Sequence, residues 1–320
     1  IRDVAVTGVQ TCALPICSLK DGSTIKRTGT GLVYAGYSWR GRSQGPAKAS
    51  KPDDFNSEAR ETLWIAPDQS YAEGRWYWGD YQEMGFDVTL KRLSAAPTVL
   101  AVGNYSVKAG TKATQLRIFG ANFPGTVTPA DLDLGAGVKI NRVVSRTPTE
   151  IVAEVDVDDK AISGNRDVGV AGAILQNGFA VYHKVDFIAV RPDNALARLG
   201  GEIHPKGYQQ FEAIAFENGP DGKPGTADDV RIGPTDVTWS VQQFLAVYGD
   251  DDKDFVGQLN ANGFFTPNVE GPNPKRKFSR NNYGNVWVVA TSKTEKGKDG
   301  KPLTGRSYLV VTVPMYSIWD

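Results

Sequence analysis

Four oxygen-bearing side chains lie close together in the stretch NGPDGKPGTADDVRIG, residues 218–233: Asp221, Thr226, Asp228 and Asp229. Calcium takes six to eight oxygen ligands, several of them from carboxylates, on a loop that wraps around the ion. The glycines and the proline between these residues permit such a loop. The stretch is therefore a candidate calcium site.

The same residues also fit a tight acidic turn that separates two strands without any metal. The segment lacks the alternating D-x-D-x-D of an EF-hand, so backbone carbonyls and water would have to complete the coordination. Similar D-x-G-x-x-G-T-x-D-D loops lie between β-strands in exported bacterial proteins. A second acidic run, YGDDDKDF at 248–255, could add ligands, but we expect it to be solvated.

The remaining residues offer little catalytic chemistry. Of the two histidines, we expect His183 on the surface of a strand and His204 in a turn. The sequence contains no CxxCH or HExxH motif and no phosphate-binding loop. The basic run PKRKF at 274–278 is short and predicts an ordinary solvated loop. No catalytic residue is assigned.

Both cysteines, Cys12 and Cys17, fall in the opening stretch IRDVAVTGVQTCALPIC. This stretch lacks the continuous apolar segment of a secretory signal. Residues 1–3 and 6–16 match the translation of a sequencing-library adapter, and residues 4–5 correspond to its index bases. We therefore expect residues 1–17 to be an adapter artefact, and neither a disulfide nor a compartment follows from the two thiols.

The composition predicts an all-β protein. The 320 residues include 7 Trp, 12 Tyr, 13 Phe, 35 Gly and 18 Pro, as many short strands joined by turns would produce. The formal net charge is zero, which indicates neither a nucleic-acid partner nor an anionic membrane, and no apolar run is long enough for a membrane span. We predict a small antiparallel β-barrel followed by two immunoglobulin-like β-sandwiches, with domains at 18–94, 95–190 and 191–320.

Aromatic residues dominate the predicted barrel. Trp76 and Trp78 alternate along one expected strand and so share a face of the sheet. They could pack in the core of the barrel, or they could form an exposed platform that binds carbohydrate. Burial of this pair would exclude the carbohydrate platform.

The two predicted sandwiches differ in their sequence patterns. The second unit resembles the IPT/TIG class of immunoglobulin-like domains, in which a G-x-N-F turn follows the second strand. We expect Gly120 and Asn122 to serve that turn through positive φ and side-chain bonds to the backbone. In the third unit, strands are expected at 206–219, 236–244, 283–293 and 305–316. They surround a long connection, 249–283, which we expect to be structureless. A structureless connection of this length is uncommon unless it covers another surface or contacts a partner.

Several longer motifs resemble a known family. They are GRWYWGDYQEMGFDVTLKRL, QLRIFGANFPG, KGYQQFEAIAFENGPDGKPGTADDVRIGPTDVTWSV and GFFTPNVEGPNPKRKFSRNNYGNVWVVAT. Over residues 18–320 the chain resembles the later domains of the α subunit of quinohemoprotein amine dehydrogenase. The resemblance implies a preceding dihaem cytochrome c domain, a separate β-propeller subunit and a γ subunit that carries cysteine tryptophylquinone. It also implies a periplasmic complex that oxidises primary amines to aldehydes and passes electrons through the haems.

The chain lacks both haem attachment motifs, so we expect no cofactor in this fragment apart from the candidate calcium. By resemblance it is a non-catalytic scaffold for the β (propeller) and γ (quinone) subunits, with exposed aromatics and the loop 262–285 as the expected subunit contacts. The alternative is a calcium-stabilised bacterial surface or adhesion protein built from immunoglobulin-like modules. Two upstream CxxCH motifs and a neighbouring propeller gene would favour the scaffold, whereas further tandem sandwiches would favour the adhesion protein.

Overall fold

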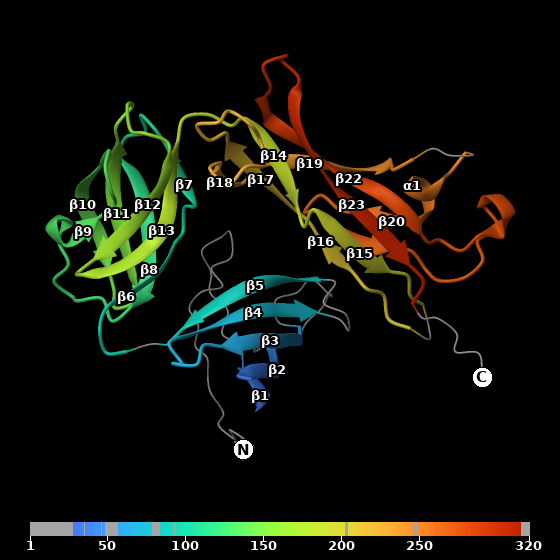
Figure 1. Cartoon of the computed structure of the whole chain (residues 1–320), viewed down its shortest axis with the longest axis horizontal. Helices are drawn as coiled ribbons and strands as arrows, with labels where there is room; N and C mark the ends of the chain where they lie inside the picture. Colours follow the sequence, from blue (N-terminus) through green and yellow to red (C-terminus); the bar gives the residue numbers. More distant parts are fainter. Residues whose placement is uncertain are drawn as a thin grey trace.

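The protein is built almost entirely of β-strands, as the sequence predicts (Figure 1). The computed structural model describes residues 28–314, except for 35, 46, 49–56, 79–83, 93, 202–203 and 246–248. The predicted adapter stretch with Cys12 and Cys17 lies outside these residues. No helix among them is long and apolar enough to cross a membrane. The strands form six sheets in three successive units.

The first unit is a five-stranded antiparallel meander that curves like half of a barrel (Figure 1). Its strands follow in chain order: β1 (Thr28–Tyr34), β2 (Ser38–Gln44), β3 (Ala59–Ile65), β4 (Tyr71–Trp78) and β5 (Met84–Lys91). On its buried face the indole of Trp39 covers two glycines, since an added Cβ would lie 2.5 Å from the ring at Gly31 and 2.7 Å at Gly41. The glycines are there to let a large ring approach the backbone closely.

The second unit is a sandwich of two four-stranded sheets. One has the order β10-β11-β8-β6 and the other β7-β13-β12-β9. The strands are β6 (Thr98–Val102), β7 (Ser106–Lys108), β8 (Thr114–Ala121), β9 (Leu132–Asp133), β10 (Val138–Arg146), β11 (Glu150–Val157), β12 (Gly164–Val170) and β13 (Ala173–Tyr182), with a short helix η1 (Pro129–Asp131). In β11 every second residue is fully buried, the period expected of a strand with one face on a core.

The turn that follows β8 is only partly as predicted. Asn122 has φ +56°, and its side-chain amide donates to the carbonyl of Ser94 at 2.5 Å, as the sequence predicts. Gly120, however, lies in the extended strand, and the expectation of a positive φ there is wrong. An added Cβ at Gly120 would lie 2.1 Å from the carbonyl oxygen of Thr98 and 2.2 Å from the Phe123 ring. Gly120 is needed for close packing between neighbouring strands.

The third unit contains three sheets: β14-β17-β18, β15-β23-β22-β19 and β16-β21-β20. The strands are β14 (Phe187–Arg191), β15 (Asn194–Arg198), β16 (Gln209–Gln210), β17 (Glu212–Glu217), β18 (Val230–Pro234), β19 (Val237–Gln243), β20 (Gly257–Leu259), β21 (Phe264–Pro267), β22 (Gly284–Lys296) and β23 (Pro302–Thr312). Their core includes Phe211, Phe265, Val286, Val288 and Leu309. Strand β14 extends across the predicted boundary at 190/191 and pairs with β17.

The connection 249–283 has structure of its own, which corrects the prediction of a structureless loop. It contains the one-turn helix α1 (Asp252–Phe255), strands β20 and β21, and the short helix η2 (Lys277–Ser279). Phe264 and Phe265 of β21 are buried, and Phe265 belongs to the core of the unit. The connection is rich in Pro, Gly and Asn, which are typical of turns, and the sequence therefore did not predict these short elements.

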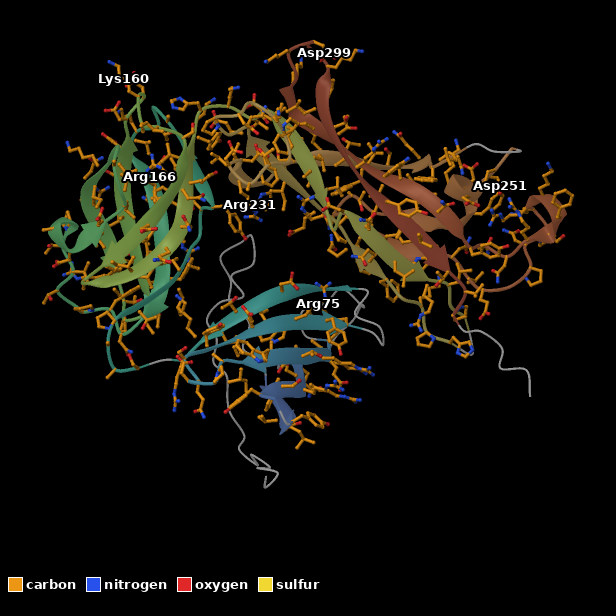
Figure 2. All side chains as sticks on the ribbon, viewed as in Figure 1. Arg75, Lys160, Arg166, Arg231, Asp251 and Asp299 are labelled. Carbon is orange, nitrogen blue, oxygen red and sulfur yellow. The ribbon has the colours of Figure 1, made fainter. Side chains whose placement is uncertain are left out.

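The second and third units are joined by side-chain contacts. Ser106 Oγ donates to the carbonyl of Ile232 at 2.6 Å, and the guanidinium of Arg231 lies 5.0 Å from the centre of the Tyr105 ring (Figure 2). The backbone N–H of His183 donates to the Glu217 carboxylate at 2.9 Å. The two sandwiches therefore share a polar junction.

Candidate functional site

The predicted calcium loop connects β17 to β18. Asp229 accepts three backbone N–H bonds, from Gly219 at 3.1 Å, Gly225 at 2.7 Å and Thr226 at 2.8 Å. These bonds tie the two ends of the loop to its middle. A carboxylate with several N–H donors is a strong structural acceptor.

The other three candidate ligands lie in the same loop and bond to one another. Thr226 Oγ1 donates to Asp228 at 2.7 Å and lies 3.4 Å from Asp221, whose carboxylate also accepts the backbone N–H of Lys223. The hydroxyl of Thr226 and the backbone N–H of Asp221 hold the pKa of Asp228 below its ordinary value. The structure thus brings all four residues together as hydrogen-bonded partners, an arrangement typical of an acidic turn. Calcium binding there stays a prediction.

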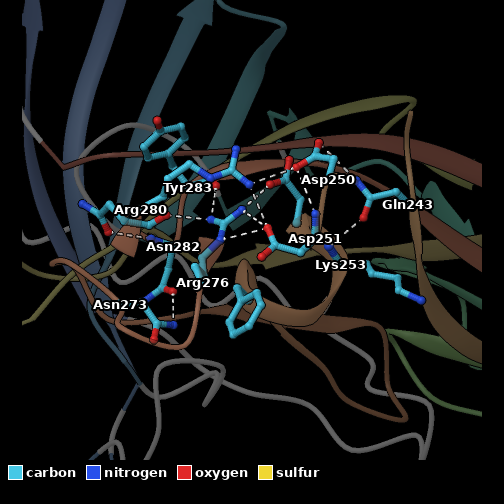
Figure 3. A network of polar contacts seen from close by, with 12 residues as sticks. Gln243, Asp250, Asp251, Lys253, Asn273, Arg276, Arg280, Asn282 and Tyr283 are labelled. Carbon is cyan, nitrogen blue, oxygen red and sulfur yellow. Dashed lines mark hydrogen bonds and ion pairs between the residues drawn. The ribbon is translucent and has the colours of Figure 1, made fainter. Parts of the chain in front are cut away.

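A second acidic cluster is the main polar feature of the third unit. Asp250, Asp251 and Asp252 place carboxylate oxygens within 4.8 Å of one another, the one grouping of this kind found in the described part of the chain. Two arginines enter the cluster (Figure 3). Arg280 bonds Asp251 at 2.9 Å and Asp250 at 3.4 Å, so guanidinium groups already supply the positive charge that a metal ion would bring.

Arg276 lies at the centre of this network, with only 1% of its side chain exposed. Its guanidinium donates to Asp251 at 2.8 Å and 3.1 Å, and to Asp252 at 2.5 Å. It also donates to the carbonyls of Asn281 at 2.6 Å and Tyr283 at 2.8 Å. Arg276 of the basic run and Asp251 and Asp252 of the acidic run therefore belong to one network, and the prediction of solvated runs is wrong for these three residues. Lys275 and Lys277 are exposed, as predicted.

The pKa values in the cluster follow burial and pairing. Burial raises the pKa of Asp252, which is 5% exposed, although the Asn285 N–H and Arg276 oppose this. Burial also acts to raise the pKa of Asp251, but Arg276 and Arg280 outweigh it and leave that pKa below its ordinary value. Burial lowers the pKa of Arg276, and its bonds to Asp251 and Asp252 outweigh that effect and raise it. The arrangement is typical of a structural ion-pair network.

The aromatic pair of the first unit does not form a carbohydrate platform. Trp76 and Trp78 share a face of β4, as the sequence predicts, but it is the buried face of the sheet. Trp76 is opposite Glu61 in the register and only 6% exposed. Trp78 is half-buried, and a sugar cannot stack on a ring with as little exposed surface as Trp76, so the carbohydrate interpretation of this pair is wrong.

The junction of the second and third units encloses an open cavity of about 670 Å³, lined among others by Tyr182, Lys184 and Asp186. Lys184 pairs with Asp186 at 2.6 Å, and burial raises the pKa of Tyr182. His183 lies exposed beside this region, between strands rather than within one, and its Nε2 lies 2.8 Å from the carbonyl oxygen of Ala161. His204 lies in a bend, as predicted.

Three consecutive stretches of the chain match three domain families of one known subunit. Residues 13–93 match "Quinohemoprotein amine dehydrogenase, alpha subunit domain II". Residues 96–183 match domain III of the same subunit, and residues 188–320 match its domain IV. No curated protein matches the chain.

Some solved structures show a weak likeness. A human protocadherin-24 EC1-2 structure is 13% identical with a TM-score of 0.25, over 69% of this chain and 98% of that one. The SGBP-B protein of a Bacteroides ovatus mixed-linkage glucan utilization locus, solved with a heptasaccharide, is 11% identical with a TM-score of 0.26, over 75% of this chain and 54% of that one. Likenesses at this level have no bearing on function.

Proposed function

The chain belongs to the quinohemoprotein amine dehydrogenase alpha-subunit family, and from this premise we propose that it is the non-catalytic scaffold portion of such a subunit. The observation that carries the proposal is the match to domains II, III and IV, in that order, across the chain. In the complex we propose, a cytochrome domain of the same subunit holds the haems, and a γ subunit holds the quinone that oxidises primary amines. Electrons pass from the quinone to the haems in the periplasm.

A scaffold role fits the chemistry of the described residues. Their charged clusters are ion pairs that stabilise the fold, such as Arg276 with Asp251 and Asp252. The bonds between Ser106 and Ile232 and between His183 and Glu217 restrict motion between the two sandwiches. A rigid support matters in such a complex because electron transfer needs donor and acceptor held at a fixed short separation.

Association with the other subunits tests this proposal. The 320-residue chain is co-expressed with the propeller and quinone subunits of its own organism, and the mixture is separated by size-exclusion chromatography with light scattering. We expect one peak that contains all three chains. Elution of this chain alone at every concentration would contradict the scaffold role.

A further inference from the structure

We propose that residues 273–283, here called the docking loop, present Phe278 as a hydrophobic anchor to another subunit of the complex. Phe278 is 83% exposed, the highest value among the large hydrophobic side chains that the structure describes. The loop lies in the third unit, whose Asp251 is at the end farthest from the second unit (Figure 2). This inference rests on the proposed function.

The backbone at Phe278 is held in a conformation that phenylalanine rarely adopts. Phe278 has φ +62° and ψ +23°, and Ser279 follows with φ +50°. Bulky residues at positive φ are strained, and such strain concentrates at ligand clamps and switch regions. Asparagine or glycine would fit this position with less strain. A strained, exposed aromatic ring costs stability without adding to the core, which indicates a role outside the folded chain.

Hydrogen bonds hold the residues on either side of Phe278. Arg276 donates to two carbonyls of the loop, those of Asn281 and Tyr283, while its other bonds reach Asp251 and Asp252. Ser279 N–H donates to the carbonyl of Arg276 at 2.9 Å. A side chain presented on a rigid loop loses little conformational entropy on binding, so the anchor is preorganised.

A second bond closes the base of the loop. The Asn273 side-chain amide donates to Asn282 at 2.8 Å, and Asn282 donates to the carbonyl of Val269 at 2.9 Å. Val269 and Tyr283 are themselves exposed, so apolar groups flank the base on both strands of the loop.

The charges around Phe278 define the surface that it would fit. Lys275 and Lys277 are exposed, and Lys277 Nζ lies 5.3 Å from the centre of the Phe278 ring. The nearby carboxylates of Asp251 and Asp252 are turned inward to Arg276. The loop thus presents an aromatic ring with the Lys277 ammonium beside it and a second exposed lysine, Lys275, three residues earlier in the chain. The complementary surface is an apolar pocket rimmed by carboxylates on another protein subunit.

The substitution Phe278→Asn separates binding from folding. Asparagine tolerates positive φ, so the chain should unfold at the same temperature as wild type or higher. Loss of an aromatic anchor should weaken association with the propeller and quinone subunits about tenfold or more. Ile162→Asn is the matched control, because Ile162 is 82% exposed on the second unit and lies outside the docking loop. We expect Ile162→Asn to associate like wild type.

The measurements are the dissociation constant of the co-expressed complex and the midpoint of thermal unfolding of the isolated chain. Weaker association of Phe278→Asn, at an unchanged or higher midpoint, supports the docking loop. Wild-type affinity of Phe278→Asn would overturn it while leaving the scaffold role intact. A lower midpoint would overturn it too, because the ring would then be part of the fold. Failure of the wild-type chain to associate would overturn the scaffold role itself, and the docking loop with it.

Discussion

Arg276 has the largest expected effect on stability among the charged residues described here. Its guanidinium pairs with Asp251 and Asp252 inside the third unit, so Arg276→Met leaves the buried Asp252 carboxylate without its ion-pair partner, whereas Asp251 keeps Arg280. Breaking a buried pair in this way costs about 3–5 kcal/mol. We expect denaturant unfolding to report a loss of that size, with little change for the exposed control Lys277→Met. Equal stability of the two variants would contradict the buried network.

Asp252 should give the unfolding free energy a distinctive dependence on pH. In the folded chain the pKa of Asp252 is raised above the ordinary value of 3.8. Its stabilising contribution to the free energy of unfolding is therefore fully present below pH 3.8 and is lost as the pH rises through the raised pKa. Asp252→Asn removes this titration. We therefore expect the wild type to lose stability relative to Asp252→Asn as pH rises from 3.8 towards neutrality. A stability difference that stays constant with pH would contradict the raised pKa.

Gly284 is required because Asp252 packs against it. An added Cβ at Gly284 would lie 2.2 Å from the Asp252 carboxyl carbon, whereas an added Cβ at Gly125 meets nothing within 4 Å. Gly284→Ala should therefore destabilise the chain by about 1–3 kcal/mol, as overpacking does. Gly125→Ala should be close to neutral. Thermal unfolding of the two variants side by side checks this, and similar midpoints would argue against the packing described.

At the scale of elements, the turn from β17 to β18 depends on the Asp229 carboxylate. Asp229→Ala removes the acceptor for three backbone N–H groups, and we expect a loss of about 1–3 kcal/mol in EDTA. Lys223→Ala is the control, since that exposed side chain holds no part of the turn. Unfolding is measured with and without calcium. A destabilisation that appears only with calcium present would show that the loop depends on a metal instead of on its own bonds.

Most strands could be predicted from the sequence because alternation and turn residues mark them locally. The strands β19, β22 and β23 lie within the predicted ranges or overlap them. Short elements inside the connection 249–283 were missed because β20 and β21 are too short to show a period. Alternation also placed Trp76 and Trp78 on one face, but it cannot say which face of a sheet is buried.

The polar network could not be predicted for a different reason. Arg276 and Asp251 are 25 residues apart, and each charged run alone is typical of a solvated segment. Only the folded chain brings them together, and the burial that makes the pair important follows from that contact. The four residues of the acidic loop were found because their spacing is local.

At the scale of the molecule, the described residues form three β units, of which the second and third share a polar junction and the third carries the docking loop. Strand β5 of the first unit lies near β16 of the third, so the third unit contacts both of the others. Such an extended surface can contact more than one partner at once. This agrees with the proposed role as a subunit that supports others.

The most direct test of whether this chain is part of a haem-bearing alpha subunit is to sequence across the 5′ end of its gene in the source DNA, with a different library chemistry. We predict that residues 1–16 are absent from the genome and that an upstream reading frame with two CxxCH motifs continues into residue 18. An encoded VTGVQTCALPIC with no haem motif before it would contradict the scaffold of a haem-bearing alpha subunit, and the function would then have to be sought in binding alone.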